Sequence, residues 1–101
     1  AATSSLLVRM WARRGDLERA IAIAFAMASP ISADIGREVI GACVRHAAVE
    51  RGLEVFRSWE TRGGFDGPDD IVRELLASGL RSSGRWAEAA TISRGQQAVL
   101  P

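Results

Sequence analysis

Few side chains in this sequence are suited to catalysis or to metal binding. The chain of 101 residues contains one cysteine, Cys43, and one histidine, His46. Cys43 falls on an apolar helical stripe, which favours a packed thiol over a nucleophile. His46 falls where a helix should end, and a cation there complements the helix dipole. One cysteine and one histidine cannot complete a tetrahedral zinc site, so we expect no metal and no cofactor.

The glycine-rich stretch RGGFDG, residues 62–67, is the remaining candidate for binding chemistry. A phosphate-binding loop needs a preceding strand, a lysine and a following serine or threonine. The chain contains no lysine, and all 13 of its basic side chains are arginine. No nucleophile elbow for a Ser-His-Asp triad is visible either. We therefore expect a surface loop here, no enzyme activity and no small-molecule substrate.

The charge balance argues against binding to nucleic acid through a broad basic face. The net charge is +1, and residues 1–32, 33–69 and 70–101 carry +2, −2 and +1. Binding of that kind depends on many basic side chains gathered on one surface. No apolar run approaches the ~20 residues that span a bilayer, so we expect no membrane span. A single cysteine fits a reducing compartment.

The elements that must position these residues follow a pattern that occurs three times. Gly15, Ala47 and Gly84 occupy matching places, at spacings of 32 and 37 residues. Apolar side chains recur at helical spacing on both sides of each, which predicts a helix, a tight turn and a second helix. The stripes after the turns are Leu17, Ala20, Ile21, Ala24 and Ala28, then Val49, Gly52, Leu53, Phe56 and Trp59, then Trp86, Ala89, Ala90 and Ser93.

Two stretches rich in helix breakers separate these units: SPISAD, residues 29–34, and RGGFDGPDD, residues 62–70. One helix pair cannot bury its apolar face alone, so such pairs stack on one another. The predicted fold is all-α: a single α-solenoid of about three helix-turn-helix repeats, residues 1–32, 33–69 and 70–101, without any sheet. Because the chain starts with alanine, we expect a processed form or a piece of a longer protein.

The repeated unit resembles that of the pentatricopeptide repeat family, whose pattern is L-I-x-x-x-x-x-x-G-x-x-x-x-A-x-x-x-F. The likeness covers nearly the whole chain. It is carried by Leu7, Val8, Gly15, Leu17, Ala20 and Met27, by Val39, Ile40, Val49, Leu53 and Phe56, and by Leu75, Leu76, Gly84 and Ala89. In the second unit Ala47 replaces the glycine and Gly52 replaces the alanine.

A tetratricopeptide-like array or another α-solenoid stays as an alternative. The tetratricopeptide family shares the glycine and the alanine, but it also wants a small residue seven positions before the glycine. This chain has Val8, Ile40 and Ala77 at that place, which favours the pentatricopeptide type.

In the pentatricopeptide family one base per repeat is read by two side chains. The resemblance therefore implies base-reading positions at Ser5, Arg37 and Glu74 and, before the next repeat, at Ser32 and Asp69. The first set is usually Asn, Thr or Ser, which hydrogen-bond base edges. Ser5 conforms, whereas Arg37 and Glu74 do not, and the chain has no asparagine. We therefore expect no sequence-specific reading of RNA.

Basic side chains recur near the end of each first helix. Arg13 and Arg45 share one place in the unit, and Arg81 lies close to that place in the third. Two interpretations stay open: these side chains contact phosphates of bound RNA, or they complement the helix dipoles and remain solvated.

The three tryptophans are expected to differ in exposure. Trp11 and Trp86 fall on or beside apolar stripes, which predicts packing in the core. Trp59 falls at the end of a helix. Two interpretations of Trp59 stay open: packing in the core, or partial exposure as a possible contact for a protein partner.

The expected function is a non-catalytic interaction module that acts as a scaffold in a large assembly. Its partners would be protein subunits of that assembly, with RNA backbone as a further contact. The resemblance implies a mitochondrial or chloroplast location. The alternative is an RNA-binding pentatricopeptide fragment that acts in organelle RNA processing or translation.

Overall fold

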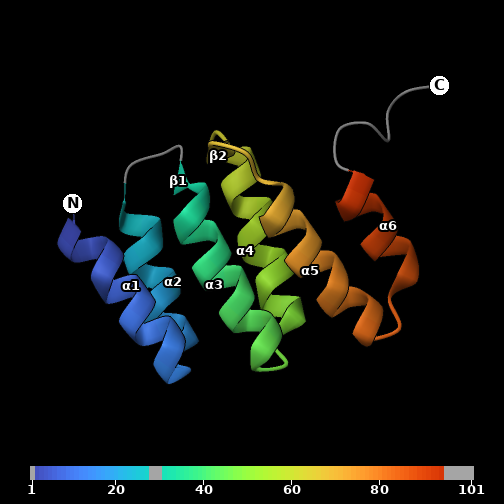
Figure 1. The fold of residues 1–101 in the computed structure, drawn as a ribbon, viewed down its shortest axis with the longest axis horizontal. Coiled ribbons are helices and arrows are strands. Elements are labelled where there is room, and N and C mark those ends of the chain that lie inside the picture. The colour runs from blue at the N-terminus through green and yellow to red at the C-terminus, as the bar shows by residue number, and fades with distance from the viewer. Residues whose placement is uncertain (1, 28–30, 95–101) are drawn as a thin grey trace.

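The computed structural model of the protein describes residues 2–27 and 31–94, most of which are helical (Figure 1). This is compatible with the predicted all-α class, and the predicted stripes lie on helices, apart from Ala28, which lies outside the described residues. The helices are α1 (Ala2–Arg14), α2 (Leu17–Ala26), α3 (Ala33–Arg45), α4 (Val49–Thr61), α5 (Asp70–Ser82) and α6 (Trp86–Arg94).

The expectation of a chain without any sheet is wrong. Two short strands, β1 (Ile31–Ser32) and β2 (Phe65–Asp66), pair in parallel. Ile31 lies opposite Phe65, and Ser32 lies opposite Asp66. The strands belong to the two stretches that connect one helix pair to the next, and pairing gives their backbone groups hydrogen-bond partners.

The turn within each helix pair has the same backbone form. Gly15, Ala47 and Gly84 have φ angles of 84°, 58° and 78°. Each turn is a Schellman motif, in which the N–H of the residue after the positive-φ position donates to the carbonyl five residues before it. These bonds run from Asp16 N to Trp11 O (3.0 Å), from Ala48 N to Cys43 O (2.7 Å) and from Arg85 N to Leu80 O (2.8 Å).

Ala47 shows that the repeated feature is the backbone conformation with positive φ, and not the glycine residue itself. Among the described residues it alone combines a Cβ with a positive φ. This conformation costs a non-glycine residue about 1–2 kcal/mol. His46 lies just before it, at the C-cap of α3, as the sequence predicts.

The helices pack within pairs and between pairs. Within pairs, α1 lies on α2, α3 on α4, and α5 on α6. Between pairs the largest contacts join the first helices, α1 to α3 and α3 to α5, which run side by side in Figure 1. The result is an elongated body of 43 × 26 × 17 Å.

Two glycines allow neighbouring helices to approach closely. A Cβ at Gly52 of α4 would lie 3.2 Å from Cys43 Cβ of α3. A Cβ at Gly79 of α5 would lie 2.9 Å from Val44 Cγ2 of α3 and 3.2 Å from Val49 Cγ2 of α4. The second contact seats α5 in the notch between the end of α3 and the start of α4.

For two tryptophans the structure decides between burial and exposure: Trp59 packs in the core, and the prediction for Trp86 is wrong. Trp59 is buried, with 2 % of its surface exposed, and its ring packs edge-on against Phe25 at 5.5 Å and Phe65 at 5.6 Å. It is therefore not available as a partner contact. Trp86, predicted to lie in the core, is 65 % exposed at the start of α6. Trp11 is partly buried against the core, as predicted.

Candidate interaction face on α1, α3 and α5

The side of α1, α3 and α5 that faces away from α2 and α4 carries most of the predicted functional residues. We call it the row face, because its three helices lie in a row in Figure 1. Two grooves and a set of ion pairs give it shape and charge. The residues of this face are Arg9, Arg13, Arg37, Glu38, Gly41, Val44, Arg45, Ile71, Glu74, Leu75, Ser78 and Arg81.

The first groove lies between α3 and α5 and encloses about 440 Å³. We call it the α3–α5 groove. A Cβ added at Gly41 would lie 3.4 Å from Arg45 Nη1 and 3.7 Å from Leu75 Cδ1, so the end of the Arg45 side chain and Leu75 cover this buried glycine. The groove is lined by Arg37, Glu38, Gly41, Val44, Arg45 and Leu75.

The second groove, the α5 groove, is a shallow depression of about 370 Å³ along α5 alone. Its lining is mainly apolar because of Leu75 and of Ile71, which is 56 % exposed. Leu75 lines both grooves and joins them. The polar residues at the edge are Glu74, Ser78 and Arg81.

The carboxylates of the row face are largely neutralised by neighbouring arginines. Glu38 lies 3.9 Å from Arg9 and 3.7 Å from Arg13, both on α1. Glu74 accepts a hydrogen bond of 2.9 Å from Arg81. Among the charged residues that line the α3–α5 groove, Arg45 forms no ion pair within the described part of the chain, so the free charge of the groove is positive.

Arg37 and Arg45 mark the ends of the α3–α5 groove. The Arg37 guanidinium is 3.5 Å from the Asp34 carboxylate, and both side chains are well exposed. Arg45 is exposed and forms no ion pair with any residue of the described ranges. An incoming anion could therefore bind Arg45 without displacing an ion pair, whereas at Arg37 it would compete with Asp34.

The five base-reading positions that the resemblance implies are not brought together as one set. The Ser32 hydroxyl accepts the Asp34 N–H at 3.2 Å and so caps α3. Asp69 accepts a 3.1 Å hydrogen bond from Arg73. Arg37 and Glu74 lie on the two grooves of the row face. Ser5 lies half-buried on α1.

The three predicted phosphate contacts do lie on one face, but they differ in availability. Arg13 is close to Glu38, and Arg81 is hydrogen-bonded to Glu74. Phosphate binding by either side chain would weaken an existing ion pair. Arg45 is the one with no such competitor in the described part of the chain.

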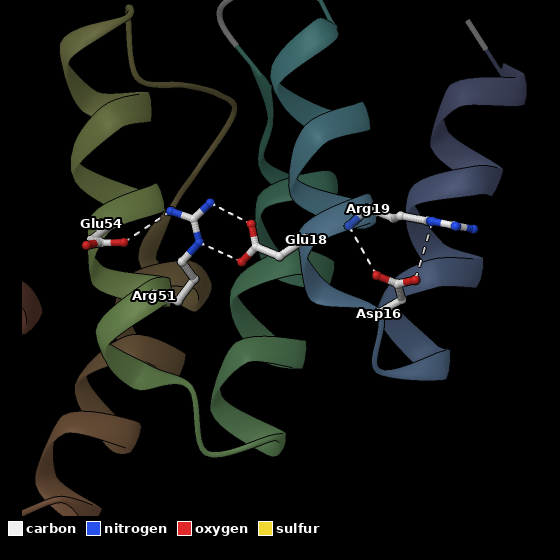
Figure 2. Close-up of polar contacts among 5 residues, drawn as sticks. All are labelled: Asp16, Glu18, Arg19, Arg51 and Glu54. Atoms are coloured by element: carbon white, nitrogen blue, oxygen red, sulfur yellow. Dashed lines mark hydrogen bonds and ion pairs between the residues drawn. The ribbon is translucent and has the colours of Figure 1, made fainter.

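The opposite side of the molecule carries ion pairs that the sequence analysis did not find. Figure 2 shows Arg51 of α4 between Glu18 of α2 and Glu54 of its own helix. Arg51 donates two hydrogen bonds of 2.8 Å to Glu18, and these lower the pKa of the Glu18 carboxyl and raise that of Arg51. Such exposed pairs contribute roughly 0–1 kcal/mol each.

The next helix pair repeats this arrangement. Arg85, just before α6, bonds both Glu50 of α4 and Glu88 of α6. The hydrogen bonds to Glu88 and Glu50 raise the pKa of Arg85. In both cases a glutamate of one helix pair forms an ion pair with an arginine of the next helix pair. That arginine also bonds a second glutamate, three residues after it in the chain. The Arg-x-x-Glu spacing is the sequence signal for the contacts within one helix pair. The contacts between helix pairs, Arg51 to Glu18 and Arg85 to Glu50, join residues 33 and 35 positions apart in the chain.

Cys43 has no features of a reactive thiol. It is fully buried, and burial raises its pKa to about 11. At neutral pH it is therefore a protonated, packed side chain, as its place on the stripe predicts.

Neither a metal cluster nor a membrane-spanning helix is found within residues 2–27 and 31–94. No three Cys, His, Asp or Glu side chains there are grouped to hold an ion. No helix there combines the length and the apolar composition needed to cross a bilayer.

Comparisons with protein-family models, with curated proteins and with solved structures give no match. The resemblance to pentatricopeptide repeats therefore rests on the residues of this chain alone, and the location and partners that it implies stay predictions.

Proposed function

We propose that the chain is an α-solenoid segment of three pentatricopeptide-type repeats that acts as a non-catalytic interaction module. The support is structural repetition: three helix pairs, each closed by a Schellman motif, with their first helices in contact along a row. Inter-pair ion pairs recur from the first pair to the second and from the second to the third. These are the features by which stacked repeats hold a common register.

The observation that carries the functional part is the row face. It combines two adjoining grooves, exposed apolar side chains and arginines with free hydrogen-bonding capacity. Residues of this kind are typical of surfaces that bind proteins. In this proposal the row face docks protein subunits of a large assembly, for which the module is a scaffold. A mitochondrial or chloroplast location follows from the resemblance alone.

The alternative is an RNA-binding fragment that acts in organelle RNA processing or translation. The specific observation in its favour is the line of arginines on the row face, which could follow a phosphate backbone. Two observations count against base reading. Ser32 and Asp69 are engaged in capping and ion pairing, and neither groove of the row face has an aromatic lining residue on which a base could stack.

RNA binding by the protein is expected to be weak and independent of sequence. Phosphate contacts by Arg13, Arg45 and Arg81 would make the logarithm of affinity fall with the logarithm of salt with a slope of about −2. The measurement is a titration with single-stranded RNA of random and of varied base composition at two salt concentrations. Nanomolar binding at physiological salt with a clear base preference would establish the alternative instead.

A matched pair of variants locates whatever RNA binding occurs. Arg45→Ala removes the uncommitted arginine of the row face and should make the salt slope shallower by about 0.7. Arg57→Ala removes an exposed arginine of α4 and should leave the slope unchanged. Equal effects of the two substitutions would show that RNA does not use the row face.

A further inference from the structure

The first helix and the last helix pair carry exposed apolar side chains. Figure 1 shows α1 at one end of the molecule and α5 and α6 at the other. Leu6 and Leu7 of α1 are 63 % and 37 % exposed. At the other end, Ile71 of α5 is 56 % exposed and Trp86 of α6 is 65 % exposed. Within the described residues, the large hydrophobic side chains that stay exposed therefore belong to the two ends of the array.

The exposed leucines of α1 stand at places that are covered in the other two helix pairs. The residue eight positions before the positive-φ residue of the turn is Leu7, Val39 or Leu76. Val39 is 1 % exposed, and Leu76 is fully buried. The helices α3 and α5 each pack on a preceding first helix, whereas α1 stands first in the row. In the described chain, Leu7 therefore lacks a neighbour that its counterparts have.

The contact of α5 with the second helix pair shows how such places are covered. Leu75, nine residues before the turn, lines the α3–α5 groove. Gly79, four residues further on, lies against Val44 of α3 and Val49 of α4. Because residues four apart lie on the same side of a helix, α5 uses one side for this contact.

The first helix presents an apolar stripe on the matching side. Leu6 and Met10 occupy on α1 the places that Leu75 and Gly79 occupy on α5. Leu6 is exposed and Met10 is half-buried. With Leu7 they fall at i, i+1 and i+4, which is one side of a helix. Thus α1 carries, uncovered, the side with which α5 packs on its neighbours.

The α5 groove is the counterpart of the α3 wall of the α3–α5 groove. Both are lined by the residues ten, nine, six and three positions before the positive-φ residue of the turn. On α3 these residues are Arg37, Glu38, Gly41 and Val44, and on α5 they are Glu74, Leu75, Ser78 and Arg81. The wall on α3 receives Leu75 from the next first helix. The α5 groove therefore stands where a further first helix would place its own leucine.

Trp86 belongs to the same surface. It lies two residues after Gly84, as Val49 lies two residues after Ala47. Val49 is half-buried, and its Cγ2 lies 3.2 Å from a Cβ built at Gly79 of the following pair. Trp86 therefore stands at the place where a following first helix would pack.

We propose that copies of this chain associate head to tail, so that α1 of one copy packs on α5 and α6 of the next, as α5 packs on α3 and α4. Leu6 enters the α5 groove, and Leu7 becomes buried. Met10 stands where Gly79 stands in the internal contact and lies against Trp86, since a flexible thioether packs well on an aromatic ring. Because Met10 is larger than Gly79, the helices stand further apart, and the association is weaker than the packing within the chain.

A second copy suits these surfaces because it supplies both of them. The nearby charges do not oppose the contact: Glu74 and Arg81 at the edge of the α5 groove bond each other, and Arg9 of α1 pairs with Glu38 of α3. The two surfaces differ, so the interface is heterologous, and each added copy leaves one end free. The inference rests on the stacked-repeat array of the proposed function, and it names the occupant of the α5 groove.

The test is sedimentation equilibrium of the purified chain from about 5 to about 500 μM, a range that covers weak protein interfaces. We expect the weight-average mass to rise with concentration beyond that of two copies. Ser78→Glu brings a charge into the α5 groove and should weaken the association about tenfold. Ser58→Glu, at an exposed serine of α4, is the matched control and should leave the association unchanged.

Mixing two variants identifies the two surfaces. Leu6→Glu places a charge on the apolar side of α1 and leaves α5 and α6 intact, whereas Ser78→Glu leaves α1 intact. Each variant alone should remain a single copy at concentrations at which the unmodified chain associates. An equal mixture should form complexes of two copies, because one intact end of each kind remains. Circular dichroism should show that both variants are folded, since both positions are exposed.

The proposal is overturned if the unmodified chain stays at the mass of one copy over the whole range, or if its mass stops at two copies, as in a symmetric dimer. It is also overturned if Ser58→Glu weakens the association as much as Ser78→Glu, or if the mixture stays at single copies. A single-copy chain whose row face crosslinks to proteins of other sequence would overturn this inference and leave the proposed function standing. Head-to-tail association of a chain whose row face contacts no other protein would support this inference and count against the scaffold function.

Discussion

Replacing Phe56 by alanine is expected to lower the free energy of unfolding by about 3–5 kcal/mol. Phe56 lies on α4 and is fully buried. Its ring is 5.7 Å from the Phe65 ring, and the Arg73 guanidinium carbon lies 5.2 Å from its centroid. The substitution would leave a cavity in the middle helix pair, which lies between the two outer pairs. Leu53→Ala should lower the free energy of unfolding by about 2–5 kcal/mol for the same reason.

Urea denaturation followed by circular dichroism measures this loss. The control is Arg57→Ala on the same helix, at an exposed position, which should change stability by no more than about 0.5 kcal/mol. An unchanged unfolding midpoint for Phe56→Ala would mean that the apolar stripe of α4 is not buried in solution, and the stacked arrangement would have to be given up.

Alanine substitutions at two glycines of the first helices are expected to have opposite signs. Gly79→Ala places a methyl group 2.9 Å from Val44 Cγ2 and 3.2 Å from Val49 Cγ2. Both neighbours are β-branched residues in helices, whose side chains have one strongly preferred rotamer and cannot easily move aside. Overpacking of this kind costs about 1–3 kcal/mol.

Gly41→Ala is the matched control on α3. Its methyl group meets only the end of the flexible Arg45 side chain at 3.4 Å and Leu75 at 3.7 Å. The gain in helix propensity should then dominate and stabilise the protein by about 0.5–1 kcal/mol. Chemical unfolding of both variants gives the comparison. Stabilisation by Gly79→Ala would contradict the close approach of α5 to the notch between α3 and α4.

Much of the fold could be predicted from the sequence because it depends on local rules. The aligned positions Gly15, Ala47 and Gly84 all have positive φ, including the one that lacks glycine. The apolar stripes mark the buried faces of the helices, since side-chain spacing along a helix is fixed. The two connecting stretches lie between pairs, as their breakers predict.

What could not be predicted depends on which elements meet at the ends of the helices. Trp59 is buried because Phe25 of α2 and Phe65 of β2 both reach the end of α4. Trp86 has the spacing of a core residue, yet it begins its helix, and no other part of the described chain covers it. The pairing of Ile31 with Phe65 likewise follows from the stacking of helix pairs, which single-residue propensities do not encode.

The candidate site shows the same division. Arg13, Arg45 and Arg81 of the row face could be identified from their recurring place in the unit. The ion pairs of Arg13 could not, because Glu38 of α3 reaches α1 only through tertiary packing, whereas Glu74 and Arg81 pair within α5. The packing of Arg45 and Leu75 against Gly41 was also missed, since a glycine within a helical pattern signals a close approach only when its neighbours are known.

The most direct test of the proposed function is site-specific photo-crosslinking in the cells that naturally make the protein. A benzophenone amino acid replaces either Ser78, on the α5 groove of the row face, or Ser58, an exposed serine of α4. The two positions differ in the face that they probe and are alike in residue type and exposure. We predict discrete protein adducts from Ser78 that survive ribonuclease treatment, and none from Ser58. Adducts from Ser58 alone, or adducts from Ser78 that disappear with ribonuclease, would contradict the claim that the row face docks protein partners.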